Sequence, residues 1–192
     1  MVYLIAGLVI FLGAHSVRIF AEDWRTATRN RLGENRYKLV YSLLSATGLA
    51  LMTWGFGAAR ETPVMLWSPP VGMRHAASLL TLLAFVLMAA AYVPGNSIKA
   101  RVHHPMVLGV KAWALAHLLA NGMAYQVVLF ASMLVWAVLC YRAARARDRS
   151  QGVRYAAGRG VATVTTVALG AASWAVFAFW LHGWLIGIRP FG

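Results

Sequence analysis

Long apolar runs alternate with short polar connections along this chain. Six runs come close to the length of about 20 mostly apolar residues that a helix needs to cross a bilayer. They are Val2–Ala21, Leu39–Ala58, Gly72–Val93, Pro105–Ala120, Met123–Tyr141 and Val161–Gly187. All six prolines lie between these runs or at their edges, where they remove no helical hydrogen bond inside lipid. The pattern predicts an all-α fold, a single-domain polytopic membrane protein with a bundle of six transmembrane helices spanning residues 1–192.

Composition excludes an ordinary soluble domain. Hydrophobic residues make up 60% of the chain and charged residues 12%, whereas a soluble protein carries about 25% charged residues. The first apolar run lacks a basic start and a small-residue cleavage site, and Glu22 and Asp23 follow it directly. These features favour a membrane helix over a signal peptide. The single cysteine, Cys140, allows no disulfide within the chain.

The positive charge is distributed unevenly between the two sides of the predicted bundle. The net charge is +13, and 15 of the 18 Lys and Arg residues lie in or beside the first, third and fifth connections. The positive-inside rule therefore places these connections in the cytoplasm and both termini on the outer side of the membrane, as in a multi-pass membrane protein. The basic clusters at helix ends fit membrane lipids with anionic head groups rather than nucleic acid.

Three polar connections have features of their own. The first, Glu22–Lys38, mixes both signs of charge and is interpreted either as an interfacial helix or ordered hairpin, or as a solvated linker. The basic stretch Arg142–Arg149 predicts a helical extension of the fifth span beyond the membrane. Asn121 and Gly122 predict a tight connection between the fourth and fifth spans.

Histidines are the candidate functional residues, because an ionisable side chain inside a membrane is costly and usually serves a function. The six are His15, His75, His103, His104, His117 and His182. His15 and His117 lie well inside predicted spans. A buried zinc site would have to use histidines alone, since no predicted span contains an acidic residue. Haem fits better, because the porphyrin supplies four ligands and the protein only one or two axial side chains in an apolar, aromatic slot.

Helix geometry limits which residues can act together. His104 and His117 are 13 residues apart, a rotation of about 220° that prevents them from sharing one iron on the same helix. Trp113, His117 and Asn121 follow i, i+4 spacing. Trp113 is therefore expected to stack on a porphyrin, and Asn121 to bond to a propionate or to the His117 ring.

Several alternatives remain open at this level. Both His15 and His75 lie at depths from which they could reach an iron held by His117. Membrane histidines also serve only to hydrogen-bond neighbouring helices, as in a scaffold or assembly subunit. A quinol site built from His75, His182 and the tryptophans of the sixth span is a further alternative, although tryptophans at membrane ends are typically interfacial anchors.

A specific family resemblance rests on two motifs. The segment from Arg101 to Gly122, with His103-His104-Pro105 and Trp113-Ala-Leu-Ala-His117, closely resembles the signature of the NnrU family of bacterial membrane proteins. The segment Gly13-Ala-His15-Ser-Val-Arg18 resembles the first-helix motif of the same family. Members are associated with denitrification, through nitrite and nitric oxide reductases. The same family contains the plant and cyanobacterial 15-cis-ζ-carotene isomerase.

The resemblance implies specific site residues and a cofactor. The isomerase holds haem b, and its axial ligands match His15 and His117, so that the resemblance favours His15 over His75. It also supports His104 as a second family position, at the cytoplasmic mouth. The isomerase branch has a cysteine three residues before the second ligand, where this chain has Ala114. This departure weakens a direct transfer of the isomerase activity.

Two functions follow as expectations. The first is a haem b-binding inner-membrane protein that binds nitric oxide and works with a denitrification or electron-transfer protein. The second is a haem-dependent isomerase that moves a C=C bond of a carotenoid-like polyene or another apolar lipid between its cis and trans forms.

Overall fold

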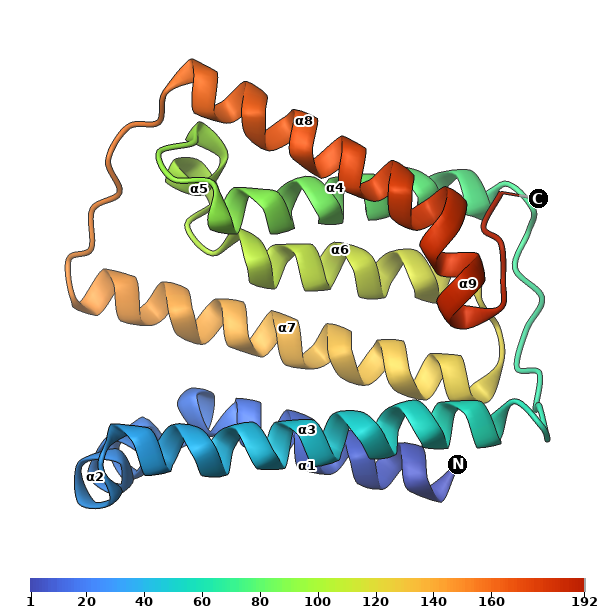
Figure 1. The fold of residues 1–192 in the computed structure, drawn as a ribbon, viewed down its shortest axis with the longest axis horizontal. Coiled ribbons are helices and arrows are strands. Elements are labelled where there is room, and N and C mark those ends of the chain that lie inside the picture. The colour runs from blue at the N-terminus through green and yellow to red at the C-terminus, as the bar shows by residue number, and fades with distance from the viewer. Residues whose placement is uncertain (192) are drawn as a thin grey trace. The chain divides into compact units, whose positions relative to one another are not determined.

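The computed structural model describes residues 1–191, whose regular structure is helical throughout (Figure 1). The helices are α1 (Val2–Phe20), α2 (Glu22–Leu32), α3 (Glu34–Ala59), α4 (Met73–Tyr92), α5 (Ser97–Val102), α6 (Pro105–Ala120), α7 (Ala124–Ser150), α8 (Gly160–Val176) and α9 (His182–Ile186). A π-helical turn, Phe177–Leu181, joins α8 to α9. The all-α prediction is thereby confirmed.

Five of the described helical segments are long and apolar enough to cross a membrane. They are α1, α3, α4, α7 and the segment Gly160–Ile186 that includes α8 and α9. The predicted fourth span is helix α6, which is apolar but has only 16 residues. These apolar helices indicate a membrane protein.

The polar connections agree in part with the sequence pattern. The first connection forms helix α2, which ends at Gly33 with a φ of 80°, so the interpretation as a solvated linker is wrong. Helix α7 continues through the basic stretch to Ser150, as predicted. Helix α3 begins at Glu34, five residues before the predicted span, because the polar residues there also have good helix propensity.

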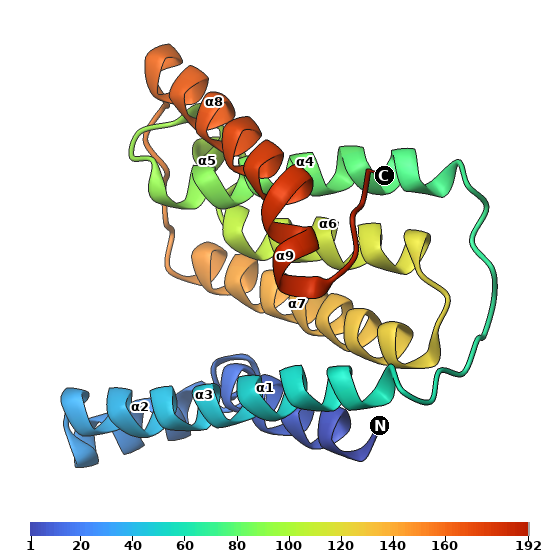
Figure 2. The ribbon, with the colours of Figure 1, turned by 45° about the vertical axis from the view of Figure 1, so that its right-hand side comes forward.

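The chain forms two compact units, and α7 contributes residues to both. Unit one comprises Met1–Ser68 and Asn121–Ala143, and unit two comprises Pro69–Ala120 together with the residues from Ala144 onward. The ribbon in Figure 2 shows the same helices from a second direction.

In unit one, α1 and α3 run antiparallel in direct backbone contact. Gly7 faces the backbone of Met52, Gly48 faces Phe11, where an added Cβ would lie 2.7 Å from the backbone nitrogen, and Gly55 faces the backbone at Leu4. Small residues allow such close approach, which is a common way to stabilise helix pairs in lipid. The buried core of this unit includes Leu4, Leu8, Ala59 and Tyr125.

In unit two, α4 packs against both α6 and α8. Gly109 of α6 faces the carbonyl oxygen of Ala84 on α4, and Gly170 of α8 faces the backbone of Val86. Ala112 and Ala116 of α6 are buried, and small residues four apart on a helix allow close approach of a neighbouring helix. Helix α6 is therefore held closely against α4 by small side chains.

Asn96 organises the sharp connection between α4 and α5. Its side chain is buried, with 1% of the residue exposed. The amide nitrogen donates to the carbonyl oxygens of Ala90 and Val93, and the amide oxygen caps α5 by accepting from the backbone N–H of Lys99. One side chain thus satisfies three backbone groups that would otherwise lie unpaired.

Replacing Asn96 with alanine is expected to lower the free energy of unfolding by about 3 kcal/mol, because a cap and two buried carbonyl partners are lost together. Denaturant titration in detergent, followed by circular dichroism, measures the change. Asn30→Ala is the matched control, since Asn30 is exposed on α2. Equal losses in the two variants would contradict this role.

Candidate functional site

His15 lies half-buried on α1 among aromatic rings of unit one. Its ring stacks on that of Phe11, with centroids 4.2 Å apart. Tyr41 of α3 and Trp136 of α7 contribute further ring contacts, at centroid distances of 5.2 Å and 6.0 Å. The histidine predicted from the first-helix motif therefore has apolar, aromatic surroundings.

His117 lies on α6, beside Trp113 and among buried alanines. The two rings are 5.1 Å apart between centroids and are tilted by 52°. Ala114 and Ala116 are fully buried. The predicted shared face of Trp113 and His117 is confirmed by this ring contact.

The two histidines make the same backbone hydrogen bond. Nδ1 of His15 lies 2.7 Å from the carbonyl oxygen of Phe11, and Nδ1 of His117 lies 2.8 Å from that of Trp113. A carbonyl oxygen only accepts, so Nδ1 carries the proton in each ring. In the neutral form, Nε2 then carries the lone pair that can bind a metal. Each bond also fixes the orientation of its imidazole.

Three other predicted residues have different surroundings. Helix α6 ends at Ala120, so Asn121 lies just beyond the helix, where its amide oxygen accepts from Nε2 of Gln126 at 3.0 Å. His75 is exposed in the first turn of α4. His104 precedes Pro105 and donates a hydrogen bond from Nε2 to Asp148, away from the Trp113–His117 face, as the helical spacing predicts.

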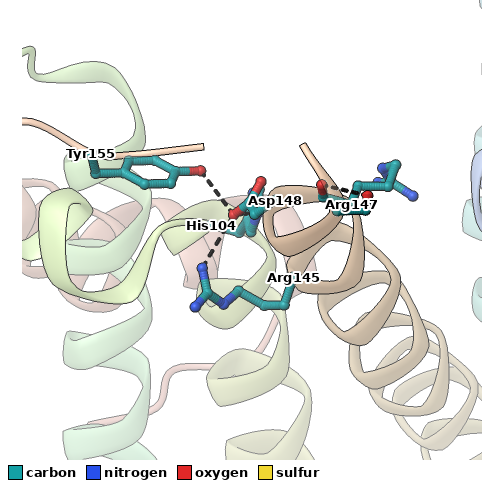
Figure 3. A network of polar contacts seen from close by, with 6 residues as sticks. His104, Arg145, Arg147, Asp148 and Tyr155 are labelled. Carbon is teal, nitrogen blue, oxygen red and sulfur yellow. Dashed lines mark hydrogen bonds and ion pairs between the residues drawn. The ribbon is translucent and has the colours of Figure 1, made fainter. Parts of the chain in front are cut away.

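Asp148 is the centre of a polar network that the sequence pattern did not indicate (Figure 3). One carboxylate oxygen, Oδ2, accepts from Nε2 of His104 at 2.9 Å, from Nη1 of Arg145 at 3.2 Å and from the hydroxyl of Tyr155 at 3.2 Å. The carboxylate is 12% exposed. The sequence contains one signal of this network, because Asp148 is a lone acid within a strongly basic stretch. Such an acid suggests a paired carboxylate but does not identify its partners.

His103, beside this network, has a strained backbone. Its φ of 67° and ψ of −54°, with a 2.8 Å hydrogen bond from the N–H of His104 to the carbonyl of Val102, define a γ-turn of the rare type. A side chain with a Cβ disfavours positive φ. Its ring packs edge-on against Tyr155 at 4.2 Å. Its Nδ1 is buried without a hydrogen-bond partner among the described residues.

Burial lowers the pKa of His103 below its usual value, and the nearby charge of Arg145 lowers it further. The unfolded chain therefore takes up a proton at higher pH than the folded one, and the free energy of unfolding falls as the pH drops below about 6.5. His103→Gln is expected to reduce this loss between pH 7 and pH 5, measured by denaturant titration. His75→Gln, at an exposed position, should leave it unchanged; equal effects would contradict the assignment.

The described residues contain no group of three or more His, Cys, Asp or Glu side chains placed to hold a metal ion. Among known proteins, the family model described as NnrU protein matches residues 3–190, nearly the whole chain. No curated protein and no solved structure matches. The match includes both motifs on which the resemblance rests, and the chain therefore belongs to the NnrU family.

Proposed function

We propose that this protein binds haem b in the bacterial inner membrane, with His15 and His117 as axial ligands, and acts in nitric oxide metabolism during denitrification. The observation that carries the proposal is the identical hydrogen bond of the two rings, from Nδ1 to the carbonyl four residues earlier. Histidine ligands to metals usually donate their second ring N–H in this way.

The donor chemistry fits haem better than a bare metal ion. Haem supplies four nitrogen ligands, so isolated imidazoles suffice, and no larger cluster of ligating side chains occurs within residues 1–191. The rings of Phe11, Tyr41 and Trp136 near His15, and of Trp113 near His117, are typical walls of a haem slot. When bound, haem iron with a displaceable axial imidazole supplies a coordination position for a diatomic ligand.

The charge distribution and helix lengths support six spans with both termini in the periplasm. The 16 residues of α6 rise about 24 Å, which crosses a hydrocarbon core slightly thinner than the usual value of about 30 Å. The basic ends of the helices then contact anionic lipid head groups.

Absorption spectroscopy of the purified protein tests the proposal. A Soret band, a pyridine haemochrome spectrum of the b type and about one haem per chain are expected. Adding nitric oxide to the reduced protein should shift the band. A folded preparation without a Soret band, obtained from cells supplied with haem precursor, would overturn the cofactor assignment.

Isomerisation of a cis polyene is the second candidate function, and it draws support from the family resemblance alone. Ala114 occupies the position of the isomerase cysteine and is fully buried, with 0% exposed. A ligand exchange through sulfur at that position is therefore absent. Incubation of the reduced protein with a cis-polyene, followed by chromatography, separates the two functions.

A further inference from the structure

The Asp148 network joins the residue before α6 to the end of α7 and to the connection that follows α7, all within unit two. His104 immediately precedes α6, Arg145 and Asp148 lie in the last turns of α7, and Tyr155 belongs to the connection between α7 and α8. Figure 3 shows His104, Arg145 and Tyr155 converging on the Asp148 carboxylate. The network therefore ties the start of α6 to two other parts of the chain.

The same contacts surround the strained turn. Tyr155 touches the ring of His103 with its own ring and donates its hydroxyl proton to Asp148. His104, the next residue, is held by the same carboxylate oxygen. A residue in a sparsely populated backbone region persists only where its surroundings fix it. That restraint is provided by a closed ring of contacts, which links His103, His104, Asp148 and Tyr155.

We propose that Asp148 is a positioning residue for His117. By holding His104 and Tyr155, it maintains the strained turn at His103. This turn fixes the rotation of α6 about its axis and its position along that axis. The role of His117 as a haem ligand rests on the proposed function, whereas the restraint on the position of α6 is independent of it.

Helix α6 can transmit such a restraint. It is an uninterrupted helix from Pro105 to Ala120, and His117 lies about 18 Å from its start. On the α4 side, Gly109 meets the carbonyl oxygen of Ala84 closely enough that an added Cβ would lie 3.1 Å from it. A relaxed turn at His103 would therefore shift the helix as a body and change the surroundings of the His117 ring.

The test compares Asp148→Ala with Asp23→Ala, because Asp23 is the only other aspartate of the chain and is exposed on α2. Protein labelled with ¹⁵N-histidine is examined by NMR as purified, in the reduced state, and the His117 signal is assigned with His117→Gln. We expect the His117 ring nitrogen signals to shift in Asp148→Ala and to remain at the wild-type position in Asp23→Ala. Unchanged His117 signals in a folded Asp148→Ala protein would overturn the proposal.

Two further variants keep the test decisive. If Asp148→Ala does not fold, Tyr155→Phe removes a single hydrogen bond of the network and should produce a smaller shift of the same signals. His103→Gly removes the strain, since glycine accepts positive φ readily. Adding it to Asp148→Ala should therefore return the His117 signals toward the wild-type position. Failure of this rescue would contradict the mechanism.

The measurement also separates the two proposals. A wild-type protein without haem would refute the proposed cofactor, yet the histidine signals would still report whether Asp148 positions α6. Conversely, if the wild type binds haem but the His117 signals are the same in every network variant, only the positioning role is refuted.

Discussion

Replacing Gly55 with alanine is expected to lower the free energy of unfolding by about 3 kcal/mol or more, one of the largest effects of a single methyl group in this chain. A Cβ at Gly55 would overlap the backbone of α1 at Tyr3 and Leu4. Because the obstacle is backbone rather than a flexible side chain, no change of rotamer relieves it, and the two helices must separate. Denaturant titration in detergent, followed by circular dichroism, measures the loss.

Gly57→Ala provides the matched control on the same helix. An added Cβ at Gly57 meets no atom within 4 Å, and alanine favours a helix interior over glycine by about 0.5–1 kcal/mol. This variant should therefore match or exceed the stability of the wild type. A similar, small effect at both positions would show that α1 and α3 do not pack through their glycines.

Replacing His117 with alanine is expected to reduce the haem content of the purified protein at least about tenfold, because loss of even an outer-shell partner costs 10- to 100-fold in metal affinity. The change removes the imidazole and leaves the small, buried alanines of α6 around it. His15→Ala should have a comparable effect. Haem per chain, from the pyridine haemochrome and a protein assay, provides the measurement.

His75→Ala is the control, since His75 is exposed at the start of α4 and should leave haem content unchanged. Free imidazole added to His117→Ala should restore part of the wild-type spectrum by occupying the vacated coordination position. Full haem content with an unaltered spectrum in folded His15→Ala and His117→Ala proteins would remove both residues from the haem assignment.

The sequence pattern predicted those parts of the fold that depend on local hydrophobicity. The apolar runs place α1, α4 and α6 within one residue of their predicted ends. The Trp113–His117 contact follows from helical spacing alone. Such features can be predicted without knowing which helices pack against one another.

Features that depend on non-local contacts escaped prediction. His104 and Asp148 are 44 residues apart, and no periodicity connects a residue before one helix with an acid at the end of another. The glycines of α3 were visible, but their partners on α1 were not. Asn121 was placed on the His117 face by spacing, yet α6 ends one residue earlier because the chain turns there toward α7.

The π-helical turn between α8 and α9 makes the orientation of this end of the chain sensitive to the deletion of one residue. A π-helical turn accommodates one more residue than the α-helical turn it replaces, so everything beyond it is rotated by about 100°. Phe177–Leu181 thus determines which way the exposed Trp184 is presented. Loss of a single codon in this stretch would restore a uniform helix and turn the aromatic end to another side, a larger rearrangement than most amino-acid exchanges produce.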